Sequence, residues 1–175
     1  MINNLNSDLI VQKGVFMKRF LFFAVLISVF WFINSPVLAD ENADALKFFR
    51  HYVNAANSYS SSILDMYSPD AKIIRQVITP EGELVDVEAD TDTYIRQLKI
   101  GSKAAKLRQY KNNYTNITTA KTDKGIKISA MRQPSGEKYK LRFYMIVKKQ
   151  SDGQWKIVEE LMQTKVQTFL KYAKR

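Results

Sequence analysis

The residue in this sequence most suited to acid–base chemistry is its single histidine, His51. Histidine titrates near neutral pH and can act as a general base. It is followed by Tyr52 in a segment whose apolar spacing predicts a helix, and Asp92 lies in the first turn of a later predicted helix. These three residues are the candidates for proton transfer. The competing interpretation of His51 is a solvated histidine, or one at the edge of the core.

A second group of residues is suited to ligand binding. Arg132, Arg142 and Tyr144 lie on neighbouring predicted strands, and arginine presents a planar fork to a carboxylate or a phosphate. Together with Trp155 and Glu159 on the last predicted strand, they are the candidate binding residues for a small apolar or anionic ligand. The alternative is that these side chains are solvated or pair with acidic residues across the strands.

The sequence contains no cysteine. This excludes a disulfide framework, a zinc–thiolate site and a thiol nucleophile. One histidine cannot form a metal site alone, and no carboxylate cluster at ligand spacing accompanies it. We therefore expect neither a metal nor a cofactor.

The segment before the helices has the pattern of a secretory signal peptide. The cationic residues Lys18 and Arg19 precede an apolar run of 14 residues, 20–33, and small residues at Val37 and Ala39 form a cleavage site. The run is shorter than the about 20 residues that cross a bilayer. We expect a leader over residues 1–39, with the signal peptide over 17–39, and one domain over residues 40–175, in the periplasm or secreted. The alternative is an uncleaved N-terminal helix that anchors the protein in a membrane.

Helices followed by strands are expected to position the candidate residues. Apolar spacing predicts helices over residues 40–59, 61–67 and from 90 or 91 to about 101. Alternating or β-branched segments predict strands over residues 71–79, 84–87, 107–122, 126–132, 138–149 and 154–163. The predicted fold class is α+β, with three N-terminal helices packed on one face of a curved antiparallel sheet.

Two local patterns carry a family resemblance. Residues 64–73 (LDMYSPDAKI) and residues 152–160 (DGQWKIVEE) resemble the nuclear transport factor two-like superfamily, a cone-shaped α+β fold that includes SnoaL-like polyketide cyclases and ketosteroid isomerases. The resemblance covers nearly all of residues 43–165. It implies a pocket between the sheet and the helices, lined by the inner faces of residues 138–149 and 154–163. It also implies that a homodimer through the open sheet face is plausible.

Fold alone does not assign a function, because the superfamily includes isomerases, cyclases, dehydratases, adaptors, secretion-system subunits and envelope lipid carriers. Its enzymes use a pocket aspartate or histidine, aided by tyrosine, for proton transfer. No carboxylate in this sequence aligns with those catalytic residues. The resemblance therefore favours binding over catalysis.

Charge divides the sequence into an acidic and a basic part. Residues 40–95 contain 4 basic and 11 acidic residues, whereas residues 96–175 contain 20 basic and 5 acidic residues. A basic sheet face of this kind suits an anionic membrane surface or an acidic protein partner. Nucleic acid would also fit electrostatically, but export and the lack of a recognition motif argue against it.

The leading hypothesis is an exported, non-enzymatic binding protein of the cell envelope or the medium, which uses a hydrophobic pocket or a basic sheet face. One alternative is a small SnoaL-like isomerase, cyclase or dehydratase, which requires a carboxylate or His51 inside the pocket. The other is a subunit of a secretion or envelope-assembly apparatus, which requires an uncleaved N-terminal helix.

Overall fold

The fold of this 175-residue chain is described for residues 37–173 in a computed structural model. Residues Glu41–Arg175 form one compact unit. The predicted leader, including the apolar run over residues 20–33, lies outside the described residues. Within the described part of the chain, no helix is both long and apolar enough to cross a membrane.

The described residues form four helical segments and six strands. The helical segments are α2 (Val37–Asn57), η2 (Ser61–Met66), α3 (Thr91–Leu107) and η3 (Gln167–Tyr172). The strands are β1 (Tyr67–Ile78), β2 (Leu84–Ala89), β3 (Asn112–Thr122), β4 (Gly125–Pro134), β5 (Leu141–Lys149) and β6 (Trp155–Thr164).

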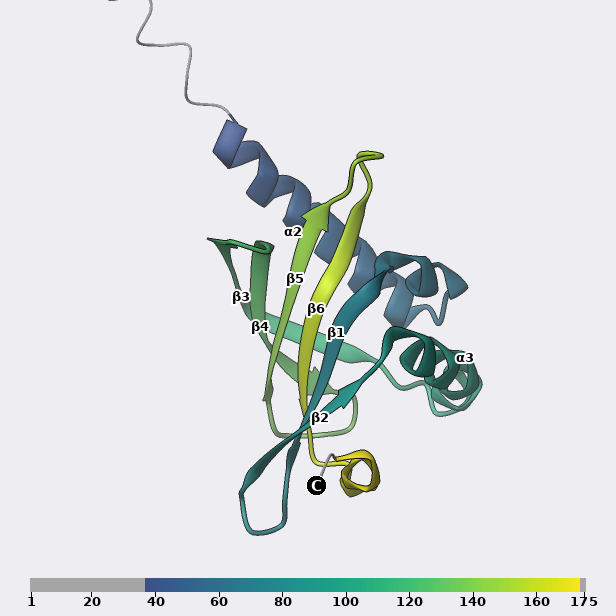
Figure 1. Ribbon diagram of the computed structural model, residues 1–175. Helices are drawn as coiled ribbons and strands as arrows, with labels where there is room; N and C mark the ends of the chain where they lie inside the picture. The colour runs from purple at the N-terminus through teal and green to yellow at the C-terminus, as the bar shows by residue number, and fades with distance from the viewer. Residues whose placement is uncertain (1–36, 174–175) are drawn as a thin grey trace, which may run out of the picture. The chain divides into compact units, whose positions relative to one another are not determined.

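The six strands form one curved, mixed sheet in the order β2-β1-β6-β5-β4-β3 (Figure 1). Strands β1 and β6 are parallel, and the other neighbouring strands are antiparallel. The prediction of a purely antiparallel sheet was therefore wrong at one pair. The reason is topological: the chain leaves the β1–β2 hairpin through α3 and returns along β3 to β6. Such a long crossover is what a parallel pair requires.

The helices differ from the predicted group of three N-terminal α-helices. The second segment, η2, is a 3-10 helix. The third, α3, lies between β2 and β3, as the predicted order of segments has it, so only α2 and η2 precede the sheet. The start of α3 is confirmed, because the Asp90 carboxylate accepts a hydrogen bond from the Thr93 N–H at 2.8 Å. The helix continues past Gly101 to Leu107, the residue at which a strand was predicted to begin, and β3 begins instead at Asn112. Alanine, lysine and leucine after Gly101 are strong helix formers and outweigh the single glycine.

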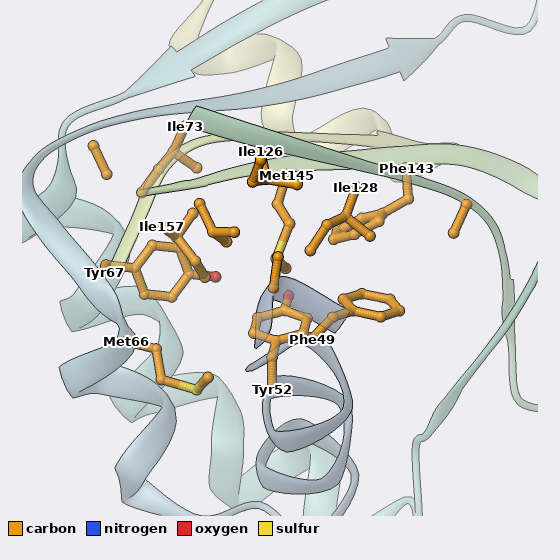
Figure 2. Close-up of a cluster of buried hydrophobic side chains, with 14 of the residues drawn as sticks. Phe49, Tyr52, Met66, Tyr67, Ile73, Ile126, Ile128, Phe143, Met145 and Ile157 are labelled. Carbon is orange, nitrogen blue, oxygen red and sulfur yellow. The ribbon is translucent and has the colours of Figure 1, made fainter. Parts of the chain in front are cut away.

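The hydrophobic core lies between α2 and one face of the sheet. Phe49 and Tyr52 are three residues apart on α2 and so lie on the same side of the helix. Both are buried, and their ring centroids lie 6.0 and 6.2 Å from that of Phe143 on β5. Figure 2 shows these two side chains pointing from the helix into the cluster formed by the sheet. This packing fixes the position of α2 over the sheet.

A β-bulge in β6 decides which glutamate enters the core. Ile146 pairs with Glu159 and Val147 pairs with Ile157, which leaves Val158 as an extra residue on β6. The alternation of side chains shifts by one residue at this point. Ile157 and Glu160 are therefore both fully buried, whereas the side chain of Glu159 lies on the opposite face of the sheet.

Candidate functional site

A cavity of about 390 Å³ lies between the helices and the sheet. Its volume falls within the range of small-molecule pockets, about 300–1,000 Å³. From α2 and the segment after it, the lining residues are Tyr52, Ala55, Ala56, Tyr59, Ser60 and Ile63. From α3 they are Tyr94, Gln97, Leu98, Gly101, Ser102 and Ala105. Tyr110, Asn112, Arg75, Met162 and Phe169 complete the wall.

Small residues on α3 leave the room for this cavity. A Cβ atom built on Gly101 would meet no other atom within 4 Å. Ser102 and Ala105 lie on the same side of the helix and also line the space. The glycine that was predicted to end the helix is thus part of the cavity wall.

A buried polar cluster centred on Glu160 lies beside the cavity. The Glu160 side chain is fully buried, and its Oε2 accepts hydrogen bonds from the hydroxyls of Tyr67 at 2.7 Å and Tyr52 at 3.1 Å. Its Oε1 lies 2.9 Å from Nη1 of Arg75 in an ion pair. A buried charge requires such partners, because desolvation of an unpaired carboxylate is strongly unfavourable.

Tyr94 of α3 completes the cluster. The guanidinium carbon of Arg75 lies 4.6 Å from the centroid of the Tyr94 ring, a cation–π contact. The Tyr67 hydroxyl lies 3.4 Å from the Tyr94 hydroxyl. Tyr52, Arg75 and Tyr94 line the cavity, whereas Glu160 is not among the lining residues. The cluster therefore presents phenols and a guanidinium to the cavity, and its carboxylate lies behind them.

The tyrosines of this cluster are hydrogen-bond donors at neutral pH. Burial raises the pKa of Tyr94 to about 12. Burial, and after it the charge of Glu160, raises the pKa values of Tyr52 and Tyr67 well above the usual value for a phenol. Burial lowers the pKa of Arg75, but Tyr94 and Glu160 raise it by more, so the guanidinium stays charged. The site can thus donate hydrogen bonds to a ligand oxygen.

The cavity wall contains no group that accepts a proton near neutral pH. The lining residues include no aspartate, glutamate or histidine. Of the three residues predicted for proton transfer, only Tyr52 lines the cavity. His51 and Asp92 are exposed and are not among the lining residues. His51 and Tyr52 are consecutive in a helix, so their side chains point about 100° apart and only one faces the core.

The predicted binding residues are not brought together at one site. Arg132 is buried on the inner face of β4, where its guanidinium donates to Asn112 Oδ1 at 2.7 Å and to the Gln163 carbonyl at 2.8 Å. Arg142 is opposite Met131 in the β4–β5 register and is exposed. Adjacent strand residues alternate between faces, so Arg132 and Arg142 lie on opposite sides of the sheet.

Tyr144 and Glu159 are paired across the outer face. The Tyr144 hydroxyl donates to Glu159 Oε1 at 2.8 Å, and Lys124 Nζ lies 2.7 Å from Oε2. A hollow of about 560 Å³ on this face includes Arg142, Tyr144 and Lys127. Lys127 contacts the Tyr144 ring, with 4.1 Å between its Nζ and the ring centroid. The side chains of Lys124, Glu159, Tyr144 and Lys127 thus contact one another across strands.

Of the two segments predicted to line the pocket, only one contributes to the cavity wall, and it does so through a single residue. Residues 138–149 contribute nothing to the cavity wall, which corrects that prediction, and residues 154–163 contribute only Met162. The inner side chains of β5, including Phe143 and Met145, are instead packed into the core under α2. Trp155 is half-buried and also packs against this core.

Replacing Glu159 with glutamine should weaken the acid sensitivity of the fold. Burial raises the pKa of Glu159, but hydrogen bonds from Lys124 and Tyr144 lower it by more. The pKa of this carboxyl group therefore lies below its usual value. A carboxylate with a lowered pKa in the folded state stabilises the fold above its unfolded pKa of about 4.3, and this contribution is lost as pH falls through the folded pKa. We expect the urea midpoint to fall less steeply from about pH 5 to pH 3 in Glu159→Gln than in wild type.

The matched control for this prediction is Glu137→Gln, which changes an exposed glutamate in the turn after β4. Its profile of urea midpoint against pH should follow that of wild type. A profile for Glu159→Gln with the same slope as wild type would show that the bonds from Lys124 and Tyr144 do not persist in solution.

Among residues 37–173, no group of histidine, aspartate and glutamate side chains is arranged to hold a metal ion. No protein-family model matches the sequence, and no curated protein matches it. Solved structures are similar in fold at low sequence identity.

Three of these structures illustrate the similarity. An NTF2-like protein of unknown function from Pseudomonas putida is 11% identical, with a TM-score of 0.54 over 71% of this chain and 86% of that chain. A protein of unknown function from Pectobacterium atrosepticum is 17% identical, with a TM-score of 0.54 over 71% and 91%. An NTF2-like protein with a cystatin-like fold from Novosphingobium aromaticivorans is 9% identical, with a TM-score of 0.53 over 72% and 82%. The chain therefore has the nuclear transport factor two-like fold.

Proposed function

We propose that this chain of the nuclear transport factor two-like fold is an exported, non-enzymatic protein that binds an apolar small molecule in the cavity between α2, α3 and the sheet. The observation that carries the proposal is the composition of the cavity wall. It is mainly apolar, and its charged residue, Arg75, is already paired with Glu160. Preformed apolar pockets with a few convergent polar groups are typical of small-molecule sites.

The polar end of the cavity defines one feature of the ligand. Tyr94 and Arg75 lie together at this end and can donate hydrogen bonds, whereas the single hydroxyl hydrogen of Tyr52 already bonds to Glu160. Glu160 largely balances the charge of Arg75, since the two groups form an ion pair at 2.9 Å. A ligand with an apolar body and a neutral oxygen acceptor, such as a carbonyl or hydroxyl oxygen, fits this arrangement better than a multiply charged one.

The cavity supports binding better than proton-transfer catalysis. An isomerase, cyclase or dehydratase needs a proton acceptor within hydrogen-bond reach of its substrate. The buried carboxylate of Glu160 accepts hydrogen bonds from Tyr52 and Tyr67, forms an ion pair with Arg75 and is not part of the wall. Burial raises the pKa values of the wall tyrosines Tyr52 and Tyr94, so these phenols stay protonated near neutral pH and cannot accept a proton.

Export is supported by the sequence pattern over residues 17–39. A cationic start, an apolar run of 14 residues and a small-residue cleavage site are the features of a signal peptide. The alternative role as a subunit of a secretion or assembly apparatus depends on an uncleaved N-terminal helix. The N-terminal mass of the native protein distinguishes the two.

Filling the cavity should abolish ligand binding. We expect Ala105→Trp to weaken binding of the fluorescent probe anilinonaphthalene sulfonate at least tenfold, because Ala105 lines the cavity and indole would occupy its space. The control is Ala104→Trp, which places the same side chain on the exposed side of the same helix and should leave the affinity unchanged. Fluorescence titration measures both. Equal affinities of wild type and Ala105→Trp would show that the probe binds elsewhere and would contradict the proposal.

A further inference from the structure

The outer side of α3 carries two large apolar side chains in contact with solvent. Leu107 is 87% exposed and Ile100 is 77% exposed, more than any other large hydrophobic residue in the described part of the chain. They are seven residues apart, which is about two helical turns, so they lie on the same side of the helix. A single exposed leucine is common, but a paired apolar strip on one helix face is typical of an interaction surface.

A row of basic residues lies beside this apolar strip. Arg96, Lys99, Lys103 and Lys106 are exposed along the same helix, and the sequence contains no acidic residue from 93 to 122. Within residues 37–173, the side chains of Lys99, Lys103 and Lys106 form no ion pair. The positive charge of the row is therefore available to a partner.

The order of residues around α3 connects this surface to the cavity. Successive residues are rotated by about 100° around the helix axis. Around this axis, the basic row lies next to the strip of Ile100 and Leu107, and the strip lies next to Gln97 and Gly101. Gln97 and Gly101 line the cavity. One helix thus has a basic edge, an apolar middle and a cavity wall, side by side.

We propose that this surface, the α3 docking face (Arg96, Lys99, Ile100, Lys103, Lys106 and Leu107), binds the surface of an anionic phospholipid bilayer. Ile100 and Leu107 enter the boundary between headgroups and acyl chains, and the basic row contacts the anionic headgroups. Long lysine side chains can bury their stems beside the apolar strip while their ammonium groups remain at the headgroups. This inference goes beyond the binding of a small molecule and does not depend on it.

Two observations favour a lipid surface over an acidic protein partner. The apolar strip consists of an isoleucine and a leucine, whereas the apolar anchors of protein interfaces are enriched in tryptophan and tyrosine, and leucine is under-represented among them. The basic row has one sign of charge over its whole length, which suits a fluid surface of like charges. Binding at this face would also bring the cavity wall formed by α3 close to the bilayer.

A cysteine-free chain makes the site of contact directly measurable. The single variants Ile100→Cys and Ile117→Cys are labelled with an environment-sensitive fluorophore, since the natural chain offers no competing thiol. Ile117 is 44% exposed on β3, the strand at the other edge of the sheet from the β1–β2 pair that α3 follows. We expect vesicles of phosphatidylcholine with phosphatidylglycerol to shift the emission of the label at position 100 to the blue and to leave the label at position 117 unchanged. Vesicles of phosphatidylcholine alone should give much weaker binding.

Two double variants that lower the net charge by the same amount test the basic row. Lys99→Gln with Lys103→Gln should weaken vesicle binding about 25-fold, since each lysine at an anionic surface contributes about fivefold. The control, Lys138→Gln with Lys140→Gln, removes the same charge from the loop between β4 and β5 and should bind like wild type.

Three results would overturn the proposal. Equal weakening by both pairs would indicate attraction through net charge alone. A label at position 117 that responds as strongly as the label at position 100 would indicate contact elsewhere, including through the leader. No response to anionic vesicles would leave an acidic protein as the occupant of the α3 docking face.

Discussion

Replacing Glu160 with alanine should lower the free energy of unfolding by about 3–5 kcal/mol, because it leaves Arg75 buried without its counter-ion. The side chain of Arg75 is 8% exposed and that of Glu160 is fully buried, so solvent screens this pair little. The hydroxyls of Tyr52 and Tyr67 would also lose their common acceptor. A buried hydrogen-bond donor that has lost its acceptor destabilises the folded state.

Urea denaturation followed by circular dichroism measures this change. The control is Glu41→Ala, which removes an ion pair with Lys121 whose partners are 43% and 62% exposed. Exposed pairs of this kind contribute little, so the control should unfold close to wild type. Equal stability of Glu160→Ala and wild type would show that Glu160 is hydrated and that the buried cluster does not exist in solution.

Replacing Phe49 with alanine should destabilise the fold by about 3–5 kcal/mol. Phe49 is 1% exposed, and its ring lies 5.3 Å from Tyr114 and 6.0 Å from Phe143, measured between ring centroids. The substitution leaves a cavity at the contact between α2 and the sheet, which rigid strands cannot close. Because α2 also positions Tyr52 in the wall of the ligand cavity, Phe49→Ala should also weaken binding of the fluorescent probe.

The neighbouring Phe48→Ala substitution is the matched control for this prediction. It removes the same side chain from a half-buried position that packs only against the edge of the core. Its loss of stability in urea should be clearly smaller than that of Phe49→Ala. Losses of the same size would mean that α2 is rotated relative to the packing described above.

Periodicity predicted the elements well but placed their faces less reliably. The apolar spacing of residues 40–59 predicted α2 and placed Tyr52 on a helix, and the turn at residues 151–153 predicted the β5–β6 hairpin. These features are local, so they can be read from the sequence. The parallel β1–β6 pair depends on contacts between distant segments, and no local pattern indicated it.

The central carboxylate of the site was missed for a physical reason. Strict strand alternation would place Ile157 and Glu159 on the same face, and Glu159, not Glu160, was among the predicted binding residues. The bulge at Val158 reverses this order and brings Glu160 into the core. Consecutive glutamates next to a buried isoleucine give no signal of a bulge.

The cation and phenols around Glu160 were also outside the prediction. Arg75 lies in a strand whose two neighbours, β2 and β6, come from different parts of the chain, and Tyr94 comes from α3. Their meeting depends on the mixed sheet and on the position of α3, which local spacing does not determine. The available signal was an arginine within a predicted strand rich in β-branched residues, because a charge that is buried there requires a buried partner.

Native mass spectrometry of the protein isolated from its own cells tests whether the cavity holds a ligand. We expect wild type to carry an apolar molecule, released by organic extraction, and Ala105→Trp isolated in the same way to carry none, because indole fills the cavity. Ala104→Trp should retain the molecule. A wild-type protein without any bound molecule, or equal occupancy in wild type and Ala105→Trp, would contradict a ligand-binding role for the cavity.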